Sequence, residues 1–117
     1  MARHSTHVLD TSRGTPAAGV DIELHAVRGL DRVRVATAVT NADGRTEAPL
    51  ASGDRLEPGV YELTFRAGAY FRRLGILVTE PPFLDEVVIR FGVADPAGHY
   101  HVPLLLSPYG YSTYRGS

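Results

Sequence analysis

Residues 99–117, which read HYHVPLLLSPYGYSTYRGS, decide the fold class that this sequence is expected to adopt. In an extended strand His99 and His101 point to one face, and four larger side chains point to the other: Tyr100, Val102, Leu104 and Leu106. This alternation predicts a strand that packs its apolar face on a core and presents both imidazoles outward, beside a surface-exposed Pro103 and Leu105.

A turn is predicted directly after this strand. Pro108 and Gly110 favour a reversal of the chain, so that residues 114–117 return antiparallel toward the two histidines. The return places a cationic segment with hydroxyl groups beside two side chains that titrate near neutral pH. The sequence therefore indicates a candidate site on the outer face of this strand.

Further strands are predicted upstream from short alternating segments. Alternation is clear at residues 20–25, 61–66 and 87–93, where apolar side chains occupy every second position. At residues 33–39 the valines are expected to face the core: Val33, Val35 and Val39.

Two local patterns differ from the strand pattern. Residues 41–44 (Asn-Ala-Asp-Gly) predict a tight turn in which Gly44 takes positive φ and delivers Arg45 to the next segment. Tyr70, Leu74 and Leu77 recur at helical spacing, so one short helix is expected within residues 69–77.

These patterns together predict the fold class. About seven to eight short strands, with turn signals every eight to twelve residues or so, indicate an all-β, two-sheet sandwich with one short helix. The order of the strands is not set by the sequence alone. A length of 117 residues is expected to form a single domain over residues 1–117.

Composition excludes several classes of function. The formal net charge of −1, from 12 basic and 13 acidic residues, argues against a nucleic-acid partner. The chain has no cysteine, so neither disulfides nor thiolate metal sites can form. No apolar stretch is long enough to cross a membrane and no leader pattern is visible, so a cytoplasmic protein is expected.

Three motifs resemble one known family. The first is residues 6–10 (THVLD) followed by residues 14–19 (GTPAAG), the second is residues 41–45 (NADGR), and the third is the stretch that ends in Tyr-Arg-Gly-Ser. In this order they resemble the 5-hydroxyisourate hydrolases, transthyretin-like enzymes of urate breakdown in purine metabolism. Transthyretin itself lacks that ending. The resemblance implies a transthyretin-type Greek key and a homotetramer with active sites at the subunit interface.

The resemblance also implies roles for particular residues. His7, Arg45, His101 and Ser117 are expected to be catalytic, and His7 and Arg45, together with Tyr114, to bind substrate. One histidine, His101 or His7, is expected to deprotonate a bound water, while Arg45 stabilises oxyanion charge.

Several points stay open at this stage. The role of His99 is undecided, and His4 and His25 match no motif. A zinc site formed by His7, His99 and His101 must be considered, because the His-x-His spacing fits one. However, the sequence places no carboxylate to complete it, and the resemblance implies chemistry without a metal or other cofactor. A serine nucleophile is disfavoured because no Gly-x-Ser-x-Gly elbow is present.

The function implied by the resemblance is hydrolysis of 5-hydroxyisourate to 2-oxo-4-hydroxy-4-carboxy-5-ureidoimidazoline. The alternative is a non-catalytic, transthyretin-like carrier of a small aromatic ligand. The two differ in the residues that they require. His7, Arg45, His101 and the Tyr-Arg-Gly-Ser ending are all present here and favour the enzyme.

Overall fold

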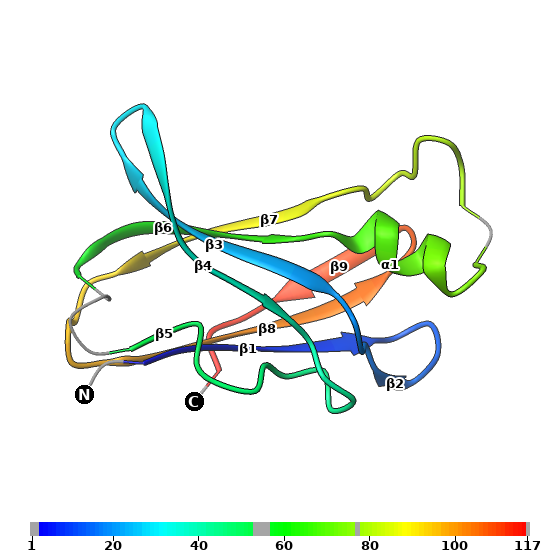
Figure 1. Cartoon of the computed structure of the whole chain (residues 1–117), viewed down its shortest axis with the longest axis horizontal. Coiled ribbons are helices and arrows are strands. Elements are labelled where there is room, and N and C mark those ends of the chain that lie inside the picture. The colour runs from blue at the N-terminus through cyan, green and yellow to red at the C-terminus, as the bar shows by residue number, and fades with distance from the viewer. Residues whose placement is uncertain (1–2, 53–56, 77, 117) are drawn as a thin grey trace.

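The computed structural model describes residues 3–52, 57–76 and 78–116 of the chain. Two β-sheets pack face to face, and a short helix lies at one end of the sandwich (Figure 1). The first sheet has the order β2-β1-β8-β9, with β5 also paired to β1, and the second sheet has the order β4-β3-β6-β7. The prediction of an all-β, two-sheet sandwich with one short helix is confirmed.

The bounds of the elements are as follows. The first sheet comprises β1 (Arg3–Asp10), β2 (Thr15–Pro16), β5 (Ala51–Ser52), β8 (His99–Ser107) and β9 (Gly110–Thr113). The second sheet comprises β3 (Asp21–Arg28), β4 (Asp31–Val39), β6 (Gly59–Phe65) and β7 (Val87–Val93), and helix α1 is Ala67–Arg73. Of these nine strands among the described residues, β2 and β5 have only two residues each.

The pairing of β1 with β8 organises the first sheet. These two strands run parallel, whereas the other strand pairs of the described chain are antiparallel. The register places Ser5 opposite His101 and His7 opposite Pro103. Because side chains alternate along both strands, the odd-numbered residues share the outer face and the even-numbered residues face the second sheet.

The core lies between the two sheets and follows from this alternation. Val8, Leu104 and Leu106 of the first sheet are fully buried, as are Leu24, Leu63 and Phe65 of the second. Burying a side chain of this size stabilises the fold by about 1.5–3 kcal/mol. The apolar face of β8 is therefore the core face, as the sequence predicts.

The helix begins and ends earlier than predicted. It buries Tyr70 and Phe71, whereas Leu74 follows the last helical residue and is 39% exposed. The reason is Gly75, whose φ of 74° and hydrogen bond from its N–H to the Arg72 carbonyl (3.0 Å) end the helix in a Schellman-type turn. Leu77 lies outside the described residues. No helix within the described ranges is long or apolar enough to span a membrane.

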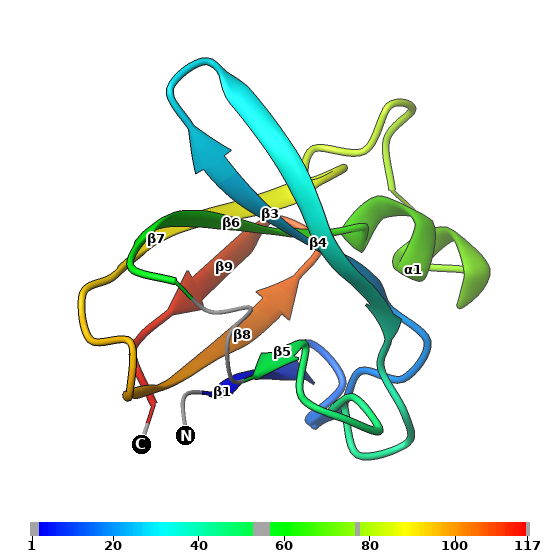
Figure 2. The same ribbon diagram turned by 60° about the vertical axis from the view of Figure 1, so that its left-hand side comes forward.

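The predicted core face of β4 is wrong for Val33 and Val39, whereas Val35 packs against the core as predicted. Ala36 lies opposite Leu24 and Ala38 lies opposite Ile22, so the alanines face the core. Val39 is 53% exposed. A register shift next to Leu24 changes the phase of the strand, and the far end of the β3–β4 hairpin extends away from the first sheet (Figure 2).

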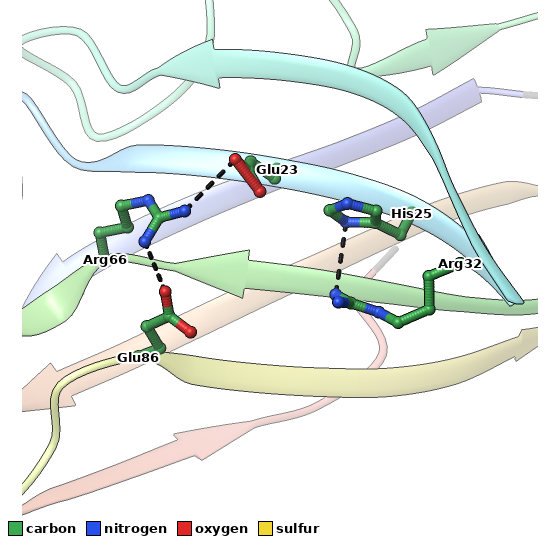
Figure 3. A network of polar contacts seen from close by, with 5 residues as sticks. All are labelled: Glu23, His25, Arg32, Arg66 and Glu86. Carbon is green, nitrogen blue, oxygen red and sulfur yellow. Dashed lines mark hydrogen bonds and ion pairs between the residues drawn. The ribbon is translucent and has the colours of Figure 1, made fainter. Parts of the chain in front are cut away.

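The outer face of the second sheet carries a network of charged side chains (Figure 3). Arg66 pairs with Glu23 at 3.3 Å and also with Glu86, and the Nη2 of Arg32 contacts the Nδ1 of His25 at 3.5 Å. His25 therefore lies on the opposite layer of the sandwich from β1 and β8, which fits its absence from any motif.

Candidate active site

The outer face of the first sheet brings together side chains from its two parallel strands. β1 contributes Ser5 and His7, and β8 contributes His99 and His101. The outward direction predicted for both β8 histidines is therefore confirmed. Pro103 was expected to be exposed, but it is buried because β8 lies between β1 and β9 and is flanked on both sides.

Arg45 reaches this face on the predicted tight turn. The side-chain carbonyl of Asn41 accepts hydrogen bonds from the N–H groups of Asp43 (2.9 Å) and Arg45 (3.2 Å). Gly44 has a φ of 77°, as predicted, and its carbonyl accepts a hydrogen bond from the Val8 N–H at 2.8 Å. A Cβ at Gly44 would lie 2.3 Å from the Val8 carbonyl oxygen, so only glycine lets the turn lie this close to β1.

His7 is fixed to the same turn by its ring. Its Nε2 lies 2.9 Å from the backbone carbonyl oxygen of Asp43. A carbonyl can only accept a hydrogen bond, so the Nε2 of His7 carries the hydrogen. In the neutral ring, the nitrogen left with a free lone pair is therefore Nδ1.

His101 is held from both sides. Its Nδ1 lies 2.9 Å from the hydroxyl of Ser5 on β1, and its carbonyl accepts a hydrogen bond from the Gly116 N–H at 2.8 Å. Burial lowers the pKa of His101, and the neighbouring charges of Arg45 and His7 lower it further. The three residues His7, Arg45 and His101 thus form one electrostatically connected group, although they come from distant parts of the sequence.

The chain after β9 packs along β8. The guanidinium of Arg115 lies 4.5 Å from the centre of the Tyr100 ring and donates a hydrogen bond to the His99 carbonyl at 3.3 Å. Tyr114 precedes it and is 60% exposed. The return toward the histidines is confirmed as far as Gly116, and Ser117 lies outside the described residues.

A small pocket adjoins this group. It has a volume of about 220 Å³ and runs along β1 to the segment that follows the turn, with Ser5, Arg3 and Arg45 in its lining. Typical small-molecule sites enclose about 300–1,000 Å³. The pocket of one chain is therefore smaller than a usual ligand site. In the described ranges, no three His, Cys, Asp or Glu side chains gather as a metal site would require.

Two residues of this region escaped sequence reasoning. Ser5 matches no catalytic pattern, and only its alternation with His7 could have placed it on the outer face. His4 is fully buried on the inner face, 4.8 Å from the Phe91 ring, and neither ring nitrogen has a hydrogen-bond partner among the described residues. Burial lowers the pKa of His4 to about 4, with a further contribution from His101.

Fold and site together define a transthyretin-type sandwich with a histidine- and arginine-bearing group on the outer face of one sheet. The chain belongs to the HIUase/Transthyretin family, whose pattern it matches over residues 4–116.

Named relatives agree with this assignment. The chain is 54% identical to a 5-hydroxyisourate hydrolase of Pseudomonas aeruginosa, over 100% of this chain and 93% of the relative. The structure of the Klebsiella pneumoniae 5-hydroxyisourate hydrolase superposes with a TM-score of 0.83, at 40% identity and over 100% of both chains. Transthyretin from Sparus aurata superposes with a TM-score of 0.87, at 29% identity over 97% of this chain and 96% of its own.

Proposed function

We propose that this protein hydrolyses 5-hydroxyisourate to 2-oxo-4-hydroxy-4-carboxy-5-ureidoimidazoline. The observation that carries the proposal is the placement of His7 and His101 on one sheet face, with Arg45 on the turn that pairs with β1. The grouping occurs in a chain that is 54% identical to a hydrolase of that name. The reaction adds water across a ring amide: a carbon–oxygen bond forms, the carbon–nitrogen bond breaks, and the ring nitrogen takes a proton.

In this proposal His101 is the general base. A histidine with a lowered pKa stays neutral at pH 7, so it can accept a proton from water. The water oxygen then adds to the amide carbon. The Nε2–H group of His7 donates its hydrogen bond to the Asp43 carbonyl, which leaves Nδ1 as a second proton acceptor.

Arg45 binds the ring and stabilises the charge that develops on the attacked carbonyl oxygen. A guanidinium presents several donors in one plane, which matches adjacent carbonyl and amide groups of the substrate. Its charge also disfavours protonation of His101 before water attacks. Tyr114 contributes to substrate binding in this proposal, and Ser117 completes the catalytic group.

We further propose a homotetramer whose active sites are completed across a subunit interface. Two features support it: the small volume of the single-chain pocket, and the side chain of Tyr114, which is 60% exposed in one chain. Light scattering coupled to gel filtration tests this assembly. A monomer with full activity would contradict the shared site.

The activity itself is tested by generating 5-hydroxyisourate in situ with urate oxidase and following its ultraviolet absorbance. The protein is expected to accelerate the decay over the spontaneous reaction. The His101→Asn variant serves as the matched inactive protein. Decay at the spontaneous rate, combined with binding of the substrate, would instead support a transthyretin-like carrier.

A further inference from the structure

Among the residues that the structure describes, Ser5 is the one side chain that holds the ring of His101 at its Nδ1 atom. The two residues are 96 positions apart in the sequence and meet because β1 and β8 pair in parallel, with Ser5 directly opposite His101. The distance of 2.9 Å between Oγ and Nδ1 is that of a normal hydrogen bond, and the contact is partly buried.

Contacts on both sides of the ring determine which nitrogen of His101 is free to accept a proton. Ser5 occupies the Nδ1 side, while Gly116 lies so close to the other side that a Cβ there would be 2.5 Å from Cδ2. Nδ1 and Cδ2 both adjoin Cγ at the base of the imidazole. The outer end of the ring, which includes Nε2, therefore points away from the sheet.

We propose that Ser5 is a positioning residue that accepts a hydrogen bond from the Nδ1–H of His101 and so keeps the lone pair of the neutral ring on Nε2. This inference rests on the proposed function, in which His101 is the base. When Nε2 takes a proton from water, one water O–H bond breaks and one N–H bond forms. The Nδ1–H group is unchanged, so its hydrogen bond to Ser5 persists through the transfer.

A hydroxyl suits this position better than the carboxylate that often orients a catalytic histidine. A carboxylate stabilises the imidazolium and raises the pKa of its partner. The uncharged Ser5 fixes the tautomer without this effect, so burial and Arg45 can keep His101 unprotonated. The contrast with His7 is informative, because the Asp43 carbonyl holds the proton of that ring on Nε2 instead.

The inference is tested with Ser5→Ala, Ser5→Thr and a matched control, Ser112→Ala. Ser112 lies on β9 opposite Leu105, on the same face of the first sheet. We expect Ser5→Ala to lower kcat about tenfold, the effect of losing one neutral hydrogen bond, with little change in KM. Ser5→Thr keeps a hydroxyl and should restore most of kcat. Ser112→Ala should match the wild type.

A second readout does not depend on turnover. ¹⁵N spectra of the His101 ring, recorded with the ring neutral, should show the hydrogen on Nδ1 in the wild type and Ser5→Thr. In Ser5→Ala the ring should shift toward the Nε2–H tautomer. Loss of activity in Ser5→Thr, in a folded protein, overturns the inference, and so does an unchanged tautomer and kcat in Ser5→Ala. If no variant or wild type accelerates 5-hydroxyisourate decay, the proposed function fails, while the spectra still decide the role of Ser5.

Discussion

Replacing His4 with leucine should remove a large part of the acid sensitivity of this protein. The His4 ring is fully buried beside Phe91, and its two nitrogens have no partner among the described residues. A proton on this ring must therefore be accommodated in an apolar core. The folded state disfavours the charged form, whereas the unfolded chain does not.

The magnitude follows from the two pKa values. The folded-state pKa of His4 is about 4 and the ordinary value is 6.5. Because the folded pKa is the lower one, unfolding binds a proton. Stability is then highest above pH 6.5 and falls as the pH drops toward 4. At 1.36 kcal/mol per pH unit, the loss is about 2 kcal/mol at pH 5 and about 3 kcal/mol below pH 4.

Urea unfolding at pH 8 and pH 5, at one fixed protein concentration, measures this effect. At pH 8 His4→Leu should be at least as stable as the wild type, because it removes two unpaired polar atoms and keeps the volume. At pH 5 the free energy of unfolding of His4→Leu should exceed that of the wild type by about 2 kcal/mol more than it does at pH 8. His25→Leu, on the outer face of the second sheet, is the control and should show no such growth. If the free energies of unfolding of the wild type and His4→Leu differ by the same amount at both pH values, the reasoning is refuted.

Five further outcomes are expected from the site. His101→Asn should lower turnover by about 10²–10⁴-fold in the ultraviolet assay, and the control His25→Asn should keep the wild-type rate. If His101→Asn keeps half of the activity, His7 is the general base instead. Wild-type activity should fall with decreasing pH only below 6.5, because burial, Arg45 and His7 lower the pKa of His101. Arg45→Lys should lose nearly as much kcat/KM as Arg45→Ala, since lysine lacks the planar donors; normal kinetics would show that charge alone suffices. Gly116→Ala brings a Cβ to 2.5 Å from the His101 ring, so it should reduce turnover in the ultraviolet assay. Its melting temperature, measured in parallel, should stay close to that of the wild type. Activity should survive EDTA; loss that zinc alone restores would identify a metal site.

Local sequence patterns were sufficient for the elements that carry the site. The alternation in residues 99–107 gives the outward direction of His101, and Asn41 with Gly44 gives the turn that presents Arg45. Both predictions depend on residues that are neighbours in the chain. For that reason both could be made correctly without knowledge of the tertiary structure.

The failures arose where tertiary contacts decide the outcome. Helical spacing alone favoured Leu74, whereas Gly75 ends the helix before that residue can face the core. Val33 and Val39 do not face the core, because the partner strand and a register shift set the phase of β4. The contact between Ser5 and His101 could not be predicted, since it depends on the register of two strands 96 positions apart.

The long sequence separation between β1 and β8 has a consequence for the order of folding events. The second sheet is built from residues 21–93, and its β3–β4 pair is a local hairpin. The first sheet requires β1 to find β8, and closing so long a loop carries an entropic cost that local pairs avoid. We therefore expect the proposed catalytic group to assemble late. In a refolding experiment, recovery of hydrolysis should lag behind recovery of β-sheet signal, and a chain that ends before β8 should form strands without forming the site.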